Sequence, residues 1–170
     1  MMRHLTAKDF KEMPWANGKG ITVEMLRIER EGRLVLRLSR AMVVEDGPFS
    51  LFEGIERNLT VLSGPGFDLV GEGLRLAARP LVPVAFSGDI LLRADGVMAP
   101  SEDFNVMTDS ALPLPEVWVQ MDGIIPLGGM ALALEAGTIG GYSVARHDLV
   151  MVDHAMAHDR SVIIVRAVVV

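Results

Sequence analysis

The sequence contains no cysteine and only four histidines, which removes most routes to metal or thiol chemistry. Without cysteine there are no disulfides, no catalytic thiolates and no thiolate metal ligands. The spacing of His154 and His158 would place two imidazoles on one helical face. However, residues 150–159 are interpreted as a polar connection before the last strand, and no His-x-His pair occurs. We therefore expect neither a metal nor a cofactor.

Positive charge and long apolar runs are also scarce. The net charge is −6 and the isoelectric point is near 5.2, which argues against nucleic acid or an anionic membrane as a partner. The longest uncharged apolar stretch, residues 123–134, contains Pro126 and three glycines and is too short to span a bilayer. The first residues include no apolar run of signal-peptide length, so we expect a cytoplasmic location.

Glycine-rich phosphate loops are absent as well. The run Gly18-Lys19-Gly20 lacks the longer P-loop pattern and precedes an expected strand instead of a helix. Ser39 and Ser50 have no sequence-evident histidine and aspartate partners for nucleophilic catalysis. The sequence is therefore more typical of a protein that binds a small molecule than of one that transforms it.

Half of the 170 residues are hydrophobic, and they occur in short β-branched or aliphatic runs separated by turn residues. Glu31-Gly32 is expected to be a tight turn between two of these runs. One short helix is expected around residues 7–12, because Thr6 to Asp9 resembles a capping box, and Pro14 would end it. Such short strands indicate an all-β sandwich or barrel. The expected strands cover residues 21–30, 33–44, 57–62, 66–70, 73–77, 82–86, 90–94, 103–108, 117–121, 130–135, 142–144, 149–152 and 161–169.

The alternation of faces along a strand predicts which polar side chains point inward. Arg37 and Ser39 share one face of their strand, and both faces of that strand are largely apolar. A buried arginine must be paired or must hold an anion. Glu24 on the preceding strand is the obvious internal partner, so an ion pair and an anion site both stay open for Arg37.

The stretch from Asp46 to Arg57 has an unusual composition for a connection between strands. Phe49 and Phe52 flank Ser50-Leu51, and exposing both aromatic rings would be costly. One interpretation is that they fold over the mouth of an anion-binding pocket, with Ser50 and Arg57 beside it. The alternative is an ordinary connection whose phenylalanines plug the core.

Seven polar residues along the first 110 positions suit recognition of a small carboxylate or amide. Two are arginines, and the others are neutral hydrogen-bonding residues. On a later strand, Asp103 and Asn105 share one face, with Phe104 and Val106 opposite. The seven are Asn17, Thr22, Arg37, Ser39, Ser50, Arg57 and Asn105.

Four blocks of sequence resemble the HutD/Ves family of cupin-like proteins, whose HutD branch is associated with bacterial histidine-utilisation genes. They are residues 14–24 (PWANGKGITVE), 37–41 (RLSRA), 46–57 (DGPFSLFEGIER) and 103–107 (DFNVM), within the first 110 residues. The resemblance implies a double-barrel cupin (a bicupin of RmlC-like jelly rolls) formed as one compact domain, residues 1–170. The first barrel would cover roughly residues 14–110, and the second would be built largely from residues 111–170.

The resemblance also implies a pocket in the first barrel for a ligand such as N-formylglutamate or a related histidine-degradation intermediate. Family members have been proposed to sense or limit flux through that pathway. The matching ligand-binding positions are Trp15, Asn17, Gly18, Thr22, Glu24, Arg37, Ser39, Phe49, Ser50, Phe52, Arg57, Phe104 and Asn105.

Together these observations predict a metal-free cupin-type binding protein, with Arg57 and Arg37 on the carboxylate oxygens of the ligand. Two alternatives stay open. One is a metal-independent isomerase or hydrolase with Glu24 or Asp103 as general base. The other is an interaction protein, with a homodimer formed by the apolar second half and a vestigial pocket.

Overall fold

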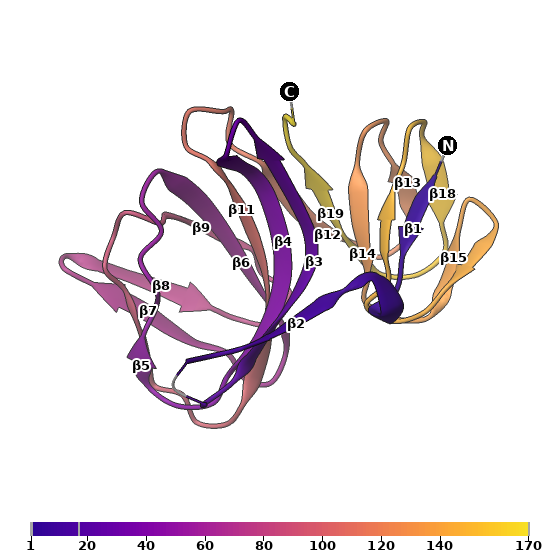
Figure 1. Cartoon of the computed structure of the whole chain (residues 1–170). Coiled ribbons are helices and arrows are strands. Elements are labelled where there is room, and N and C mark those ends of the chain that lie inside the picture. The colour runs from indigo at the N-terminus through magenta and orange to yellow at the C-terminus, as the bar shows by residue number, and fades with distance from the viewer. Residues whose placement is uncertain (1, 17, 170) are drawn as a thin grey trace. The chain divides into compact units, whose positions relative to one another are not determined.

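The computed structural model describes residues 2–16 and 18–169, and it consists almost entirely of short strands (Figure 1). The chain forms two compact units, each described separately below. The large unit comprises Lys11–Leu114 together with Val169, and the small unit comprises residues 2–10 and Pro115–Val168. Among the described residues, no helix has the length and apolar character needed to cross a membrane.

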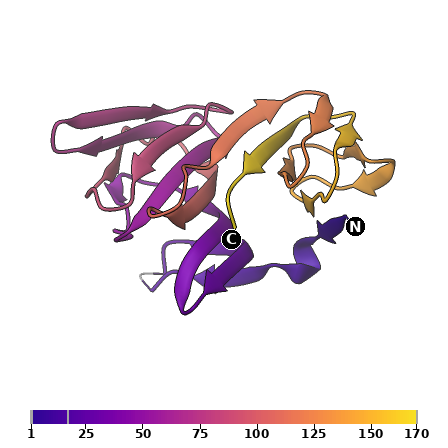
Figure 2. The same cartoon turned by 90° about the horizontal axis from the view of Figure 1, so that it is seen from above.

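The large unit consists of two sheets whose paired strands are all antiparallel. The first sheet holds, in spatial order, β2 (Lys11–Pro14), β3 (Ile21–Arg30), β4 (Arg33–Val43), β11 (Ser101–Asp109), β6 (Ile55–Ser63) and β9 (Val84–Ser87). The second sheet holds β5 (Gly47–Pro48), β10 (Arg93–Asp95), β7 (Phe67–Gly71) and β8 (Leu74–Ala78). The two sheets face each other across one apolar core (Figures 1 and 2).

The small unit also consists of two sheets. The first holds β1 (Arg3–Leu5), β17 (Leu149–Met151), β14 (Met130–Ala133), β19 (Val162–Arg166) and β12 (Glu116–Gln120). The second holds β13 (Gly123–Ile125), β18 (Met156–His158), β15 (Gly137–Ile139) and β16 (Tyr142–Val144). Residues 162–165 of β19 are buried without interruption, as expected of a strand covered on both faces.

The N-terminal helix predicted for residues 7–12 is wrong in extent. The capping box between Thr6 and Asp9 is present, but it caps only a 3₁₀ turn, η1 (Ala7–Asp9). The chain then enters β2, which pairs with β3 from Lys11 opposite Glu24 onward. Pro14 therefore ends a strand and not a helix, and it is tolerated because β2 lies at the edge of its sheet.

The interpretation of residues 150–159 as a polar connection is also wrong, because β18 lies within it. Its three residues are too few to produce an alternating pattern in the sequence. By contrast, the Glu31-Gly32 turn is confirmed. Both residues have positive φ angles, of 50° and 76°, and they join β3 to β4 with Arg30 opposite Arg33.

The core of the large unit defines the inner face of each sheet. From the first sheet, Leu59 and Val61 of β6 pack against Phe67 and Leu69 of β7. Every residue that shares a face with Leu59 therefore points toward the interior between the sheets. This places the odd-numbered residues of β6 and β11, and those of β4, on the inner face.

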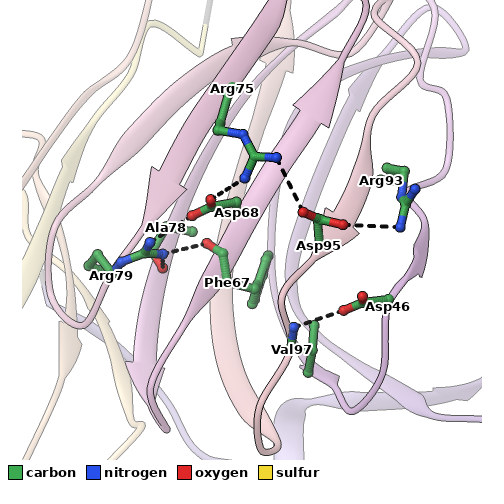
Figure 3. A network of polar contacts seen from close by, with 9 residues as sticks. All are labelled: Asp46, Phe67, Asp68, Arg75, Ala78, Arg79, Arg93, Asp95 and Val97. Atoms are coloured by element: carbon green, nitrogen blue, oxygen red, sulfur yellow. Dashed lines mark hydrogen bonds and ion pairs between the residues drawn. The ribbon is translucent and has the colours of Figure 1, made fainter.

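The outer face of the second sheet carries a network of exposed charges (Figure 3). Asp68 accepts hydrogen bonds from Arg75 and Arg79, and these two bonds lower the pKa of the Asp68 carboxyl. Asp95 bridges Arg75 and Arg93, at 3.3 and 3.1 Å. Because water screens such pairs, each contributes little to stability. Each of the three arginines therefore contacts at least one of two carboxylates, Asp68 and Asp95, on this face.

Candidate anion site in the large unit

Three neighbouring strands bring the predicted polar residues together. Met107 of β11 lies opposite Arg37 of β4 on one side and opposite Arg57 of β6 on the other. Asn105 lies opposite Ser39 and Leu59 in the same way. Paired residues share a face, so these side chains all point to the interior. The face alternation predicted for these strands is confirmed.

Arg57 is the central residue of this cluster, and its side chain is buried, with 6% of the residue exposed. Its Nη2 donates to Asn105 Oδ1 at 3.0 Å, and its Nη1 donates to the Ser50 carbonyl oxygen at 3.3 Å. Its Nε has no hydrogen-bond partner among the described residues. The guanidinium therefore has donor capacity that the protein leaves partly unused.

Aromatic rings surround the same guanidinium. Its central carbon lies 5.4 Å from the ring centre of Phe49 and 5.1 Å from those of Phe52 and Phe86. Phenyl rings stabilise a cation through their electron-rich faces and exclude water, but they do not neutralise its charge. Arg57 thus sits in a dry, aromatic environment.

No carboxylate forms an ion pair with Arg57 in the part of the chain that the structure describes. Burial, opposed by Asp103 and assisted by the nearby cation Arg37, lowers the pKa of Arg57 to about 10. At neutral pH the guanidinium stays charged. It is a buried positive charge without a directly bound negative partner.

Asp103 lies two residues before Asn105 on the same face of β11 and is 1% exposed. Its Oδ1 accepts a hydrogen bond from Asn105 Nδ2. Burial raises the pKa of the Asp103 carboxyl to about 7, although Arg57 and the hydrogen bond from Asn105 both oppose this rise. Asp103 therefore titrates near neutral pH.

Arg37 forms the internal ion pair that was one of its two predicted roles. Its Nε donates to Glu24 Oε2 at 2.7 Å. Its two terminal nitrogens contact sulfur atoms, Met107 Sδ at 4.0 Å and Met13 Sδ at 3.8 Å. Glu24 also lies 3.5 Å from Arg27. The charge of Arg37 is thus already compensated by a carboxylate.

Backbone N–H groups of the loop between β5 and β6 form hydrogen bonds to the segment that follows β9. Phe52 N donates to Gly88 O at 2.9 Å, and Gly54 N donates to Asp89 Oδ1 at 2.9 Å. Phe49 also packs against the core ring of Phe67, with ring centres 5.9 Å apart. Phe49 therefore packs against the core, and both phenylalanine rings lie over the Arg57 guanidinium.

Several predicted site residues occupy places that differ from expectation. Ser50 contacts Arg57 through its main-chain carbonyl, and no bond of its hydroxyl to Arg57 is seen. Phe104 is fully buried on the opposite face of β11, paired with Arg40 and Thr60, so it is not part of the cluster. Asn17 lies outside the described residues.

Trp15, Gly18 and Thr22 form a local structure at the start of β3. Trp15 Nε1 donates to Thr22 Oγ1 at 2.9 Å. Gly18, with a φ of 71°, donates its backbone N–H to Trp15 O at 3.0 Å. The tryptophan is half-buried, and no contact joins it to Arg57 in the described structure.

Two surface hollows lie away from the cluster. One, of about 490 Å³, is lined by Met2, Gly140, Tyr142 and His154–Ala157 in the small unit. The other, of about 220 Å³, is lined by Pro65–Asp68, Arg79, Asp95, Gly96 and Met98. Neither is lined by a residue that the sequence predicts for ligand binding, so the case for the Arg57 cluster rests on its buried polar groups.

The family model described as HutD matches residues 7–120. The chain belongs to the HutD family. It is 40% identical over 108 residues to an uncharacterized 21.2 kDa protein in the hutC 3′ region of Pseudomonas putida, a match that covers 61% of this chain and 56% of that protein. It is 35% identical over 108 residues to protein Ves of Escherichia fergusonii, covering 59% of this chain and 56% of that one. These matches thus span little more than half of the relatives' length.

The structural comparison extends over nearly the whole chain. HutD from Pseudomonas fluorescens SBW25 superposes with a TM-score of 0.87 at 25% identity, covering 98% of each chain. The all-β double-barrel cupin fold expected from the sequence is confirmed by this agreement, as is the resemblance to HutD and Ves proteins.

Proposed function

We propose that this HutD-family protein binds a small carboxylate, with Arg57 as the group that receives the carboxylate oxygens. The observation that carries the proposal is the environment of Arg57. It is a buried, aromatic-walled guanidinium with an unused Nε–H and no ion-paired carboxylate among the described residues. A charge buried in this way is costly unless an anion compensates it.

The chemistry of the cluster suits a carboxylate. Guanidinium N–H groups form strong, charge-assisted hydrogen bonds to carboxylate oxygens. Asn105 fixes the orientation of Arg57, and the phenyl rings of Phe49, Phe52 and Phe86 keep water away from the bond. Arg37 is already bound to Glu24, so Arg57 is the cation that contributes most to binding.

We further propose that the ligand is an intermediate of histidine degradation, such as N-formylglutamate, and that binding senses or limits flux through that pathway in the cytoplasm. Family membership supports this, as does the relative in the hutC 3′ region of P. putida. In this proposal the protein itself catalyses no step.

One observation favours a second candidate, a metal-independent enzyme with Asp103 as general base. Burial raises the pKa of Asp103 to about 7, which is the range that a general base needs near neutral pH. The Asn105 side chain lies between the Asp103 carboxyl and the Arg57 guanidinium. A substrate bound to Arg57 would therefore have to extend along β11 to reach Asp103.

The test is thermal unfolding with N-formylglutamate, urocanate, glutamate or formate. A ligand at about a hundredfold above its Kd stabilises the folded state by about 2.7 kcal/mol, which gives a clear rise in Tm. We expect the rise for wild-type protein and for Arg93→Ala, whose arginine is on the outer face, and its loss in Arg57→Met. A shift that persists in Arg57→Met would refute this site.

A second experiment distinguishes catalysis from binding alone. NMR spectra of the same compounds are recorded in the presence of the protein over several hours. Product formation that is lost in Asp103→Asn would establish catalysis. Stable ligand signals together with a rise in Tm would support binding alone.

A further inference from the structure

The charged side chains that face the interior of the large unit can be counted. They include two ion pairs, Glu24 with Arg37 at 2.7 Å and, at the end of β11, Asp109 with Arg33 at 2.9 Å, together with Arg57 and Asp103. Arg57 and Asp103 are left. If Asp103 is protonated, the interior holds one uncompensated positive charge, and if Asp103 is ionised, it holds none.

Asn105 connects these two groups in a fixed order. Arg57 can only donate hydrogen bonds, so Asn105 must turn its Oδ1 toward Arg57 and its Nδ2 toward Asp103. The Oδ1 of Asp103 consequently accepts from the amide, which leaves Oδ2 as the atom that carries a proton. The charge of Asp103 and the anion-binding end of the cluster, Arg57, are thus linked through the side chain of Asn105.

The surroundings of Asp103 contain few other groups that could titrate. Sheet neighbours on its face are Ala41 and Val61, and the facing sheet presents apolar Phe67, Leu69 and Ala94. Arg57 lowers the pKa of Asp103, and Glu102, paired with Arg40 on the other face of β11, raises it. The other charged groups on this face of the first sheet include Lys11 at the exposed edge, Glu24 with Arg37 and Arg27, and Asp109 at the end of β11 with Arg33. The charged residues of the facing sheet lie on its outer face.

We propose that this interior takes up one singly charged carboxylate together with one proton, and that Asp103 carries the proton. The proposal rests on the carboxylate-binding function of Arg57. A carboxylate placed on Arg57 would bring a second negative charge into the dry interior if Asp103 were ionised. Two like charges in one buried site raise the pKa of one of them, so Asp103 takes up a proton as the ligand binds.

The coupling between ligand binding and protonation of Asp103 has a measurable size. In the free protein Asp103 has a pKa of about 7. Binding therefore needs no added proton near pH 5.5 and takes up nearly one near pH 8, and the affinity falls about tenfold between about pH 6 and pH 8. Carboxylic acids with ordinary pKa values are fully ionised over this interval, so the ligand itself does not titrate.

The experiment is isothermal titration calorimetry of the full chain with N-formylglutamine and N-formylglutamate. These probes have the same shape, but the second carries one more negative charge. Each titration is run near pH 5.5 and pH 8 in two buffers with different heats of ionisation, which gives the number of protons taken up. The proteins are wild type, Asp103→Asn, and Asp109→Asn as a control on the same strand.

We expect wild type and Asp109→Asn to take up close to one proton near pH 8, and Asp103→Asn to take up none and bind with an affinity that is independent of pH. We also expect N-formylglutamine to bind at least as tightly as N-formylglutamate, because only one carboxylate is compensated. Binding without proton uptake would overturn the role of Asp103 while leaving the carboxylate-binding function intact.

A preference of more than about tenfold for N-formylglutamate would overturn the single-charge selectivity. No binding of either probe would overturn both this inference and the proposed function. If Asp103→Asn does not fold, the proton uptake of the wild-type protein decides the question alone.

Discussion

Replacing Asp103 by asparagine tests whether this carboxyl is held neutral in the folded protein. The change keeps the size and the hydrogen-bonding shape of the side chain but removes its ability to ionise. Asp103 is buried on the inner face of β11, where its Oδ1 accepts a hydrogen bond from Asn105. The asparagine can present its own carbonyl oxygen to the same donor.

The direction and size of the effect of Asp103 on stability follow from the protons that the folded and unfolded states bind. Burial raises the pKa of Asp103 to about 7 in the folded state, whereas an unfolded aspartate has a pKa of about 3.9. Between these values the folded protein binds one proton more than the unfolded chain, so the free energy of unfolding falls as pH rises. Between about pH 5 and pH 8, the ionisation of Asp103 alone lowers the free energy of unfolding by about 2 to 3 kcal/mol.

The assay is urea unfolding of wild type and Asp103→Asn at intervals from about pH 5 to pH 8. Other titrating groups contribute equally to both proteins, so the difference between their unfolding free energies isolates Asp103. We expect that difference to grow in favour of Asp103→Asn as pH rises. Asp109→Asn, from the end of the same strand, should keep the wild-type trend. Equal pH trends in wild type and Asp103→Asn would refute the argument that burial dominates this carboxyl.

Three further predictions concern stability. Arg57→Met should raise the free energy of unfolding without ligand by about 1 kcal/mol, because an uncompensated buried charge is removed; chemical unfolding measures this, and a loss of stability would contradict it. Gly66→Ala should lower the free energy of unfolding by at least about 3 kcal/mol, because a Cβ there would lie 2.1 Å from the carbonyl oxygen of Ala78. Gly96 has a similar φ but open space around it, so Gly96→Ala should lower this free energy by only about 1 kcal/mol. Comparable losses of Tm in the two variants would refute this prediction. His4→Ala should cost about 1 to 2 kcal/mol and speed hydrogen exchange in β1, because its ring contacts buried Asp148 at 2.7 Å; unchanged exchange would argue against that anchor.

Strand alternation is the part of the site that could be predicted from the sequence. The period of two placed Arg37 with Ser39, and Asp103 with Asn105, on common faces, and the register confirms both. It also identified Glu24 on the preceding strand as the partner of Arg37, although Glu24 lies opposite Ser39 in the register. Local pattern was sufficient to pair β3 with β4, but it did not predict the two register shifts within that pair.

Contacts between strands far apart in the sequence could not be predicted in this way. Phe86 lies opposite Arg57 because β9 pairs with β6, and nothing in the local pattern of either strand specifies that pairing. That no acid among the described residues forms an ion pair with Arg57 depends on where every other carboxylate of the large unit lies. The backbone contact from Ser50 to Arg57 depends on the path of the loop, and not on the type of residue.

The pairing of β1 with β17 bears on the order in which the chain becomes protected during synthesis. Arg3 lies opposite Met151, so the first strand of the small unit meets its partner only after residues 11–114 of the large unit have been made. Domains fold as units while the chain emerges from the ribosome. The large unit can therefore fold early, while the backbone N–H and C=O groups of residues 3–5 are still unpaired and can pair with strands of other chains. Newly made protein should pass through a state in which only the small unit is open to proteases and aggregation.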